Sequence, residues 1–446
     1  MLKNLNKKII NCYSNYDSHN VKKGYFFYPE SIEDLKNIIN LAKKYKKKIL
    51  CIGKSNNWFD TIINNNQFII SLHKLKKKIL FYPKKNLICV TPNITIHNII
   101  NFLKKKKYTI QNIPGVTNIT VGGCVSNNVH GKDSFKNGSF IDCIDEIKIL
   151  TSENKILICS RKRNKEIFFA AIGGLGLIGI ILEIKIYIKK IKFSGLIIRS
   201  FKCNNIYSIK KKFEKYKKRS DFIYAWIDTT SKRNIGRGIV FSCNYSNRYK
   251  VNKIKNLTAN KYLSKLIFFI LRCIFKLDLV KILNFFYFKI TNNFNKKFQY
   301  TEEFFNTSQN NLIDLPKLIF PDSFVEIQFI VPEKKFSIIT QFINLMHSLG
   351  LNSLITGMKL HKKSDGYLNF SDNGYTFGIN CKCNSNDYEK INKLIKLHNF
   401  LIKKKIKIYL AKDFFMKRKD IKNTYPNFNK FIKIKKKIDK KEIFYS

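Results

Sequence analysis

Glycine is scarce in this chain of 446 residues, and its placement constrains the fold more than any other feature. Nine of the 19 glycines lie in three segments. These are Gly53-Lys-Ser55, the stretch from Gly115 to Gly131, and Gly173-Gly-Leu-Gly-Leu-Ile-Gly179. Glycine is needed where backbone passes close to a ligand or adopts a positive φ, and successive turn amides form nests for phosphate. Three such segments, each joined to a predicted strand, favour a dinucleotide site over ordinary tight turns.

The apolar pattern around these segments predicts alternating strands and helices. Ser31 and Asp34 have the spacing of a capping box, and the 3.6-residue period after them predicts a helix. A second helix is expected from a cap at Thr91 to Asn93 until about Lys105. The Rossmann fingerprint is absent, because no GxGxxG lies between a first strand and a helix with an acidic residue about 20 positions further on, and no P-loop is present. The expected strands are 49–52, 87–90, 108–110, 140–150, 180–188, 222–228, 324–331, 375–381 and 407–413.

Composition, length and charge limit the classes of protein to which this chain can belong. With 44% hydrophobic and 14% aromatic residues the chain can bury real cores, and its length predicts two domains or one large domain with an insertion. Lys and Arg outnumber Asp and Glu by 84 to 30, a net charge of +54 that is typical of polyanion binding. Only nine of the 84 are Arg, however, and the lysine runs are scattered. We therefore attribute the charge mainly to A/T-rich codon usage and expect no nucleic-acid partner.

The cysteines and the apolar segments predict in which cellular compartment the protein is found. The 11 cysteines are odd in number and lack a CxxC, and Cys381-Lys-Cys383 is a poor zinc site without nearby histidines. Free thiols, no metal and a cytoplasmic location are therefore expected. No signal peptide is visible after Met1, and charges interrupt the apolar stretch 263–290, so no transmembrane helix is expected. That stretch is either an ordinary core helix or an amphipathic one lying on the inner face of a membrane.

In order and spacing, the glycine segments resemble the FAD-binding domain of the vanillyl-alcohol-oxidase superfamily. The resemblance extends to the decaprenylphosphoryl-ribose 2-oxidase family through Ala225-Trp-Ile-Asp228, Glu326-Ile-Gln328, Met358-Lys-Leu360 and Tyr409-Leu-Ala-Lys412-Asp413. It implies an α+β, two-domain flavoprotein. An FAD-binding domain of two α+β subdomains would cover 1–192, a cap built on an antiparallel sheet 193–405, and a C-terminal segment returning to the first domain 406–446.

The resemblance implies FAD as the cofactor. A histidine commonly links the flavin covalently at the position of Lys54, so non-covalent FAD is expected here. The residues implied in cofactor binding are Gly53, Lys54, Ser55, Asn56, Gly115, Thr120, Gly122, Gly123, Asn127, His130, Gly131, Gly179 and Tyr409.

Lys412 and His130 are the implied catalytic residues. Oxidising a sugar alcohol sends a hydride to flavin N5 and leaves negative charge at the N1–C2=O edge, which a cation stabilises. A desolvated amine could also handle the hydroxyl proton. Taken alone, Lys412 is typical of a solvated lysine, and His130 is either a core histidine or a substrate donor. Only the motif context singles them out.

Substrate contacts are implied for the cap and its surroundings. They would come from Lys132, Trp226, Gln328, Lys359 and Lys412. Without the resemblance, Trp226 is typical of a core aromatic, and Gln328 and Lys359 of strand surfaces. Three departures from the family pattern concern the substrate: Asn56 replaces a tyrosine, Glu326 a glutamine and Gly378 a cysteine.

Three functions remain open at this stage. The first is oxidation of a sugar secondary alcohol, the C2 hydroxyl of a polyprenyl-phosphoryl pentose, as the first half of an epimerisation. A lipid-linked sugar phosphate would be the substrate, and a separate NAD(P)H-dependent keto-reductase would complete the reaction. The second is an aldonolactone or alditol oxidase that uses O₂, such as D-arabinono-1,4-lactone oxidase. The third is a non-catalytic basic binding protein on the same fold.

Overall fold

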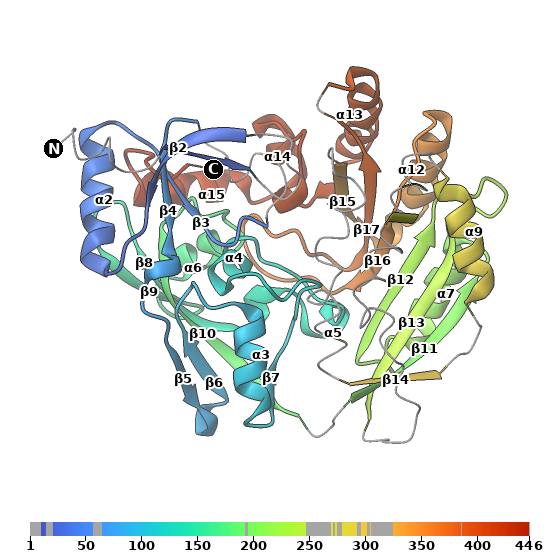
Figure 1. Cartoon of the computed structure of the whole chain (residues 1–446), viewed down its shortest axis with the longest axis horizontal. Helices are drawn as coiled ribbons and strands as arrows, with labels where there is room; N and C mark the ends of the chain where they lie inside the picture. The colour runs from blue at the N-terminus through green and yellow to red at the C-terminus, as the bar shows by residue number, and fades with distance from the viewer. Residues whose placement is uncertain are drawn as a thin grey trace.

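The computed structural model describes residues 10–14, 21–56, 65–191, 195–246, 269–270, 273, 279–291, 296–300, 304, 324–384 and 386–445. It has two lobes, one containing the N-terminal elements and the other a large sheet with its helices (Figure 1). The expected α+β class is confirmed. The boundaries drawn at 192 and 405 remain predictions.

The first part of the N-terminal lobe is a small sheet in the order β1-β2-β4-β3. Its strands are β1 (Ile10–Ser14), β2 (Val21–Phe27), β4 (Phe68–Ser71) and β3 (Ile49–Ile52). β2 and β3 both run parallel to β4, and helix α2 (Ile32–Lys44) connects β2 to β3. The expected capping box is confirmed, because Ser31 and Asp34 each bond the other's backbone.

The second part of this lobe is an antiparallel sheet in the order β5-β6-β10-β8-β9, with β7 paired to β10. Helix α3 (Ile96–Lys104) joins β6 to β7, and the short helices α4 (Val121–Ser126), α5 (Ser134–Asn137) and α6 (Lys165–Ala171) follow. The strands are β5 (Ile79–Tyr82), β6 (Leu87–Val90), β7 (Tyr108–Ile110), β8 (Ile144–Leu150), β9 (Ile156–Ser160) and β10 (Ile180–Lys190).

Two local predictions for this lobe are wrong. The cap of α3 is Thr95, whose hydroxyl accepts from the Asn98 amide, rather than a residue of 91–93. Residues 140–143 form a 3₁₀ turn before β8 instead of its first part. In both places local side-chain hydrogen bonds to the backbone set the boundary, so α3 and β8 each begin later than the apolar pattern suggests.

The second lobe, the cap, is one antiparallel sheet in the order β14-β11-β13-β12-β16-β17-β15-β18 within the described residues. Buried apolar side chains of α7 (Ile206–Tyr216), α12 (Ser337–Ser348) and α13 (Tyr388–Lys403) pack against one face of it. The strands are β11 (Gly195–Cys203), β12 (Phe222–Asp228), β13 (Arg237–Ser246), β14 (Lys296–Tyr300), β15 (Phe324–Pro332), β16 (Thr356–His361), β17 (Gly374–Lys382) and β18 (Lys407–Ile408).

The last segment runs from the cap back to the N-terminal lobe. After β18 the chain makes a 3₁₀ turn at Leu410–Lys412 and forms α14 (Arg418–Thr424) and α15 (Phe428–Ile438), which lie beside the blue elements in Figure 1. The Ile49 amide donates to Ile443 O at 2.6 Å, and the Tyr445 amide donates to Ile49 O at 3.0 Å. The expected strand 407–413 is thus a two-residue strand and a turn, which brings Lys412 out of the sheet.

Part of the apolar stretch 263–290 lies outside the described residues. Its end forms helix α9 (Val280–Ile290), on the cap. Asn284 of this helix is buried and donates to Asp228 at 3.2 Å, and Tyr287 packs edge-on against Trp226. Within the described ranges, no helix has both the length and the apolar content to cross a bilayer.

Candidate active site

A cavity of about 880 Å³ lies between the N-terminal lobe and the cap. All three glycine segments line it, and β15, β16 and the 3₁₀ turn at 410–412 supply its cap side. A cavity of this size at the junction of two lobes is a typical cofactor and substrate site.

The first two glycine segments meet at the wall of this cavity. A Cβ atom on Gly53 would lie 2.3 Å from the Thr120 hydroxyl oxygen, so the turn after β3 requires glycine there. Thr120 is itself the N-cap of α4 and accepts from the Gly123 amide at 3.3 Å. Gly122 is constrained from another side, because its Cβ would lie 2.8 Å from Cβ of Pro92. At these two glycines the chain thus brings backbone to the cavity surface.

Other glycines leave space that a ligand can use. A Cβ on Gly115 or Gly176 would meet no atom within 4 Å, although both residues line the cavity. Gly176 has a φ of +79°, which other residues rarely adopt. These glycines therefore form a cradle that a bound group could touch directly at the backbone.

His130 is held at the boundary between the lobes. Its Nε2 lies 3.2 Å from Nε2 of Gln328 on β15, and its ring packs against His361, Phe370 and Tyr409. Burial lowers the pKa of His130 well below its usual value, and the nearby Lys359 lowers it further. His130 is therefore neutral at physiological pH.

Two polar atoms of this pair have no partner among the described residues. They are Nδ1 of His130 and Oε1 of Gln328, and both are buried. Buried polar atoms in proteins nearly always form hydrogen bonds, so atoms like these at a cavity wall indicate a bound group that completes them. Tyr409 is satisfied by contrast, because its hydroxyl donates to Asn127 O at 2.9 Å.

Lys412 forms an ion pair with the cap. Its Nζ lies 2.7 Å from Oε1 of Glu326, whose side chain is only 8% exposed. Lys412 leaves β18 through the turn at 410–412, whereas Glu326 stands on β15, 86 residues away. A carboxylate therefore holds this ammonium group at the cavity.

Lys359 is the second amine of the cap side. It lies on β16, opposite Tyr224 of β12 and Thr376 of β17. Burial lowers the pKa of Lys359 to about 7, and the neighbouring Lys412 contributes. The same environment lowers the pKa of His361, two residues along β16, to about 3.

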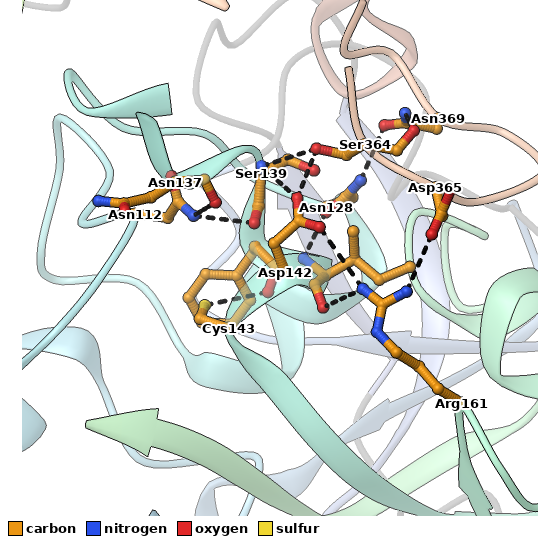
Figure 2. Close-up of polar contacts among 12 residues, drawn as sticks. Asn112, Asn128, Asn137, Ser139, Asp142, Cys143, Arg161, Ser364, Asp365 and Asn369 are labelled. Atoms are coloured by element: carbon orange, nitrogen blue, oxygen red, sulfur yellow. Dashed lines mark hydrogen bonds and ion pairs between the residues drawn. The ribbon is translucent and has the colours of Figure 1, made fainter. Parts of the chain in front are cut away.

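A buried polar network fixes the loop that precedes His130 (Figure 2). The Asn128 amide group donates to Oδ1 of Asn369 at 3.1 Å, and Oδ1 of Asn128 accepts from the Ile141 amide at 2.9 Å. Ser364 donates to Asp142 at 2.5 Å. Because Ser364 and Asn369 belong to the loop after β16, the network joins the cap to the N-terminal lobe beside the site.

Fifteen of the residues expected from the sequence line the cavity. Gly131 is outside it, and its Cβ would meet the Asp133 carboxylate and Ile113 O, so its role here is close packing. Lys132 stands over the rings of Tyr224 and Phe304, in a small adjoining space. The fifteen are Gly53, Lys54, Ser55, Asn56, Gly115, Thr120, Gly122, Gly123, Asn127, His130, Gly179, Gln328, Lys359, Tyr409 and Lys412.

Trp226 does not line the cavity either; it packs against Tyr287 of α9. Its predicted contact with the sugar stays a prediction. No group of three or more ligating side chains that could hold a metal occurs in the described part of the chain.

Sequence reasoning missed several lining residues. They include His73, Lys77, His97, Asn98, Leu175 and Gly176. Leu175 and Gly176 could have been found, because both stand within the third glycine segment. The others follow from chain folding rather than from a local pattern. Glu326 was noted only as a departure, and its pairing with Lys412 needed the structure.

Comparison with known proteins agrees with this geometry. Residues 24–160 match the family described as FAD binding domain. The chain is 30% identical over 161 residues to D-arabinono-1,4-lactone oxidase of Yarrowia lipolytica, covering 35% of this chain and 30% of that protein. L-gulonolactone oxidase of Bos taurus is 26% identical over 159 residues, with 36% of each chain covered.

Cytokinin dehydrogenase 1 of Arabidopsis thaliana is 25% identical over 186 residues, which cover 38% of this chain and 32% of that protein. The chain thus spans about a third of the length of the curated relatives that it matches. The cavity volume, the open glycines and the unpartnered polar atoms of His130 and Gln328 all fit a large bound cofactor. Residues 24–160 match an FAD binding domain, and FAD is the cofactor of this chain.

Proposed function

We propose that this chain is an FAD-dependent oxidoreductase that oxidises a secondary alcohol of a sugar to a ketone. One observation carries the proposal. At the end of the cavity formed by the cap, two lysines, a neutral histidine and an unsatisfied glutamine amide surround the space next to Tyr409. Bound FAD supplies a two-electron acceptor, and these side chains can bind a hydroxylated substrate and receive its proton.

We further propose that the substrate is anionic, namely a polyprenyl-phosphoryl pentose oxidised at C2. Lys359 and Lys412 face the cavity, and Lys132 stands close enough to lower the pKa of Lys359, while the carboxylates of Glu326 and Asp133 oppose this effect. These amine groups can donate hydrogen bonds to phosphate oxygens, which supports a phosphate-bearing ligand. A separate NAD(P)H-dependent keto-reductase would then complete an epimerisation.

FAD is proposed to bind without a covalent link. Lys54, which stands where covalent relatives commonly have a histidine, lines the cavity with Gly53 and Ser55. Acid precipitation is expected to leave all the flavin in the supernatant.

Aldonolactone oxidation is the second candidate. The comparisons favour it, because D-arabinono-1,4-lactone oxidase and L-gulonolactone oxidase are among the relatives. A lactone carries no phosphate, so under this alternative the amines at the cap would bind only its oxygens and stabilise charge during oxidation.

Anaerobic bleaching of the flavin with a panel of substrates separates these candidates. We expect polyprenyl-phosphoryl pentoses to bleach it, Lys412→Met to slow bleaching at least about 100-fold, and the exposed Lys419→Met control to have no effect. Bleaching by galactono-, gulono- or arabinono-lactone, with peroxide released in air, would instead establish the second candidate. Protein that carries no FAD and binds DNA with steep salt dependence would contradict both and support a basic binding protein.

We also propose peripheral contact with an anionic membrane, where a lipid-linked substrate would be found. Helix α9 supports this proposal. Ile282, Phe286 and Ile290 recur every four residues along it and are 51%, 54% and 76% exposed, with Lys281 and Lys289 beside them. An exposed apolar stripe with a basic edge is typical of helices that lie on membranes.

A further inference from the structure

We propose that Lys359, and not Lys412, accepts the hydroxyl proton of the substrate alcohol. The inference rests on the proposed function and deepens it. It divides two tasks that the sequence assigned together to Lys412: stabilising negative charge and moving the proton.

Lys412 is engaged before any substrate arrives. Its Nζ lies 2.7 Å from Glu326 Oε1, and the carboxylate approaches from the cap sheet. An ammonium group in an ion pair offers charge but no lone pair, so it suits the stabilisation of an anion rather than the capture of a proton.

Lys359 has the opposite surroundings. Its amine has no hydrogen-bond or ion-pair partner among the described residues, although it lines the same cavity as Gln328 and His130. Gly378 on the intervening strand β17 has no side chain, and Gln328 Cγ and Glu326 Oε1 lie 3.6 Å from where its Cβ would be. The side chains of Glu326 and Gln328 therefore lie beside Gly378, and Gln328 and Lys359 line the same cavity, where a substrate would be within reach of the Lys359 amine.

The charges around Lys359 favour the neutral amine. Burial lowers its pKa to about 7, with Lys412 and then Lys132 adding to the effect, while Glu326 and Asp133 oppose it. An amine with such a pKa holds a lone pair near physiological pH, as a general base requires. The titratable and charged groups that face it are Lys412, Lys132, Glu326, Asp133, His130, His361 and Tyr224.

The proposed step balances in atoms and electrons. The C–H bond at the alcohol carbon breaks, and its electron pair leaves with the hydrogen as a hydride that FAD accepts. The O–H bond breaks as its proton moves to the lone pair of Lys359 Nζ, which becomes an ammonium group. The oxygen then forms the second bond of the ketone, so the substrate loses two electrons and two hydrogens.

The rate of anaerobic bleaching against pH tests this assignment. With wild-type protein we expect the rate to rise about tenfold per pH unit below pH 7 and to level above it. Lys359→Met should retain FAD but lose at least about 100-fold in rate, together with this pH dependence. Lys362→Met, an exposed lysine just beyond β16, is the matched control and should keep the wild-type profile.

Two charge variants should move the midpoint of the profile in opposite directions. Glu326→Gln removes an anion that raises the pKa of Lys359, so the midpoint should fall. Lys412→Met removes a cation that lowers this pKa, so the midpoint should rise even though bleaching is slower. A midpoint that vanishes in Lys412→Met and persists in Lys359→Met would overturn the proposal.

Competitive acetylation gives a readout that needs neither substrate nor turnover. In protein treated with acetic anhydride at graded pH, Lys359 should reach half-maximal labelling near pH 7, and at higher pH in Lys412→Met. Labelling of Lys359 only at the pH of surface lysines would contradict the inference. If FAD binds and Lys359 titrates near pH 7 but no alcohol bleaches the flavin, the proposed function is wrong, whereas the lowered pKa of Lys359 is established.

Discussion

At the scale of single residues, burial decides which of two similar lysines does what. Lys359 and Lys412 are both cavity residues, and nothing in their side chains distinguishes them. Glu326 stands 2.7 Å from one of them, and burial lowers the pKa of the other to about 7. The amide at this position in the resembled family could not form this ion pair, so Glu326 gives the chain an electrostatic asymmetry of its own.

The histidines of the site predict a loss of stability in acid. The pKa of His361 falls from its ordinary value of about 6.5 to about 3 because the ring is buried and Lys359 is near. Below pH 6.5 the unfolded chain therefore binds a proton that the folded chain refuses, and stability falls as the pH falls. Between pH 7 and pH 5 this histidine should cost about 2 kcal/mol in the free energy of unfolding.

Urea unfolding at both pH values measures this loss. His361→Phe keeps a ring against His130 and Phe370, so it should reduce the loss by about 2 kcal/mol. His73→Asn, which changes an exposed histidine, should leave the difference between the two pH values as in the wild type. An equal loss in His361→Phe and wild type would show that His361 is protonated in the folded protein at pH 5.

At the scale of elements, the glycine segments work through the packing of turns. The turn after β3 touches the N-cap of α4, since no side chain fits between Gly53 and Thr120. The turn at Gly115 touches nothing within 4 Å of a Cβ position and leaves cavity volume instead. Glycine thus serves two physical purposes in neighbouring walls, and substitution should separate them.

Alanine at these two positions should have different effects. Gly53→Ala should displace the Thr120 cap and so lower the stability of FAD-free protein by about 1 kcal/mol. It should also lower the affinity for FAD. Gly115→Ala should leave stability within about 0.5 kcal/mol and weaken FAD binding about tenfold or more. Urea unfolding and quenching of flavin fluorescence measure the two quantities.

Gly357→Ala is the control for both. It lies on exposed β16 backbone with nothing within 4 Å of its Cβ position, and it does not line the cavity. Neither quantity should change. Normal FAD affinity in Gly115→Ala would mean that the cofactor does not reach this wall of the cavity.

Local signals explain which elements could be predicted. The Ser31–Asp34 capping box is a contact over three residues, so sequence spacing alone located α2. Thr91 and Asn93 are residue types that commonly cap helices, as is Thr95, so the sequence alone placed the cap of α3 too early. The Thr91 hydroxyl also forms a local hydrogen bond, to the side-chain amide oxygen of Asn93 at 2.8 Å, as the Thr95 hydroxyl does to Asn98. Sequence spacing cannot tell which of two adjacent local hydrogen-bond sets begins the helix.

At the scale of the whole molecule, the contacts that complete the site join distant parts of the chain. Lys412 and Glu326 are 86 residues apart, and Asn128 and Asn369 are 241 apart. The motifs identified most of the lining residues, yet the pairings between them depend on how the cap sits on the N-terminal lobe (Figures 1 and 2). No local pattern encodes that placement, which is why the role of Glu326 was not predicted.

The net charge of +54 takes its meaning from where apolar surface lies beside it. Scattered lysines attract an anionic membrane over about a Debye length but do not orient the protein. The stripe of Ile282, Phe286 and Ile290 on α9 would orient it, with Asn284 fixing the opposite side of the helix to Asp228. Charge and stripe together predict binding to vesicles that contain phosphatidylserine, and weaker binding to neutral vesicles.

Co-sedimentation with such vesicles tests whether the stripe contributes. Replacing Ile282 and Phe286 with Ser should weaken binding about tenfold or more, because two side chains lose their burial in the lipid interface. Tyr388→Ser removes a more exposed aromatic, 74% accessible on α13, and should leave binding unchanged. Raising the salt concentration should weaken wild-type binding without abolishing the difference between wild type and the double variant. Equal binding by the double variant and wild type would reduce the membrane contact to charge alone and contradict a docking role for α9.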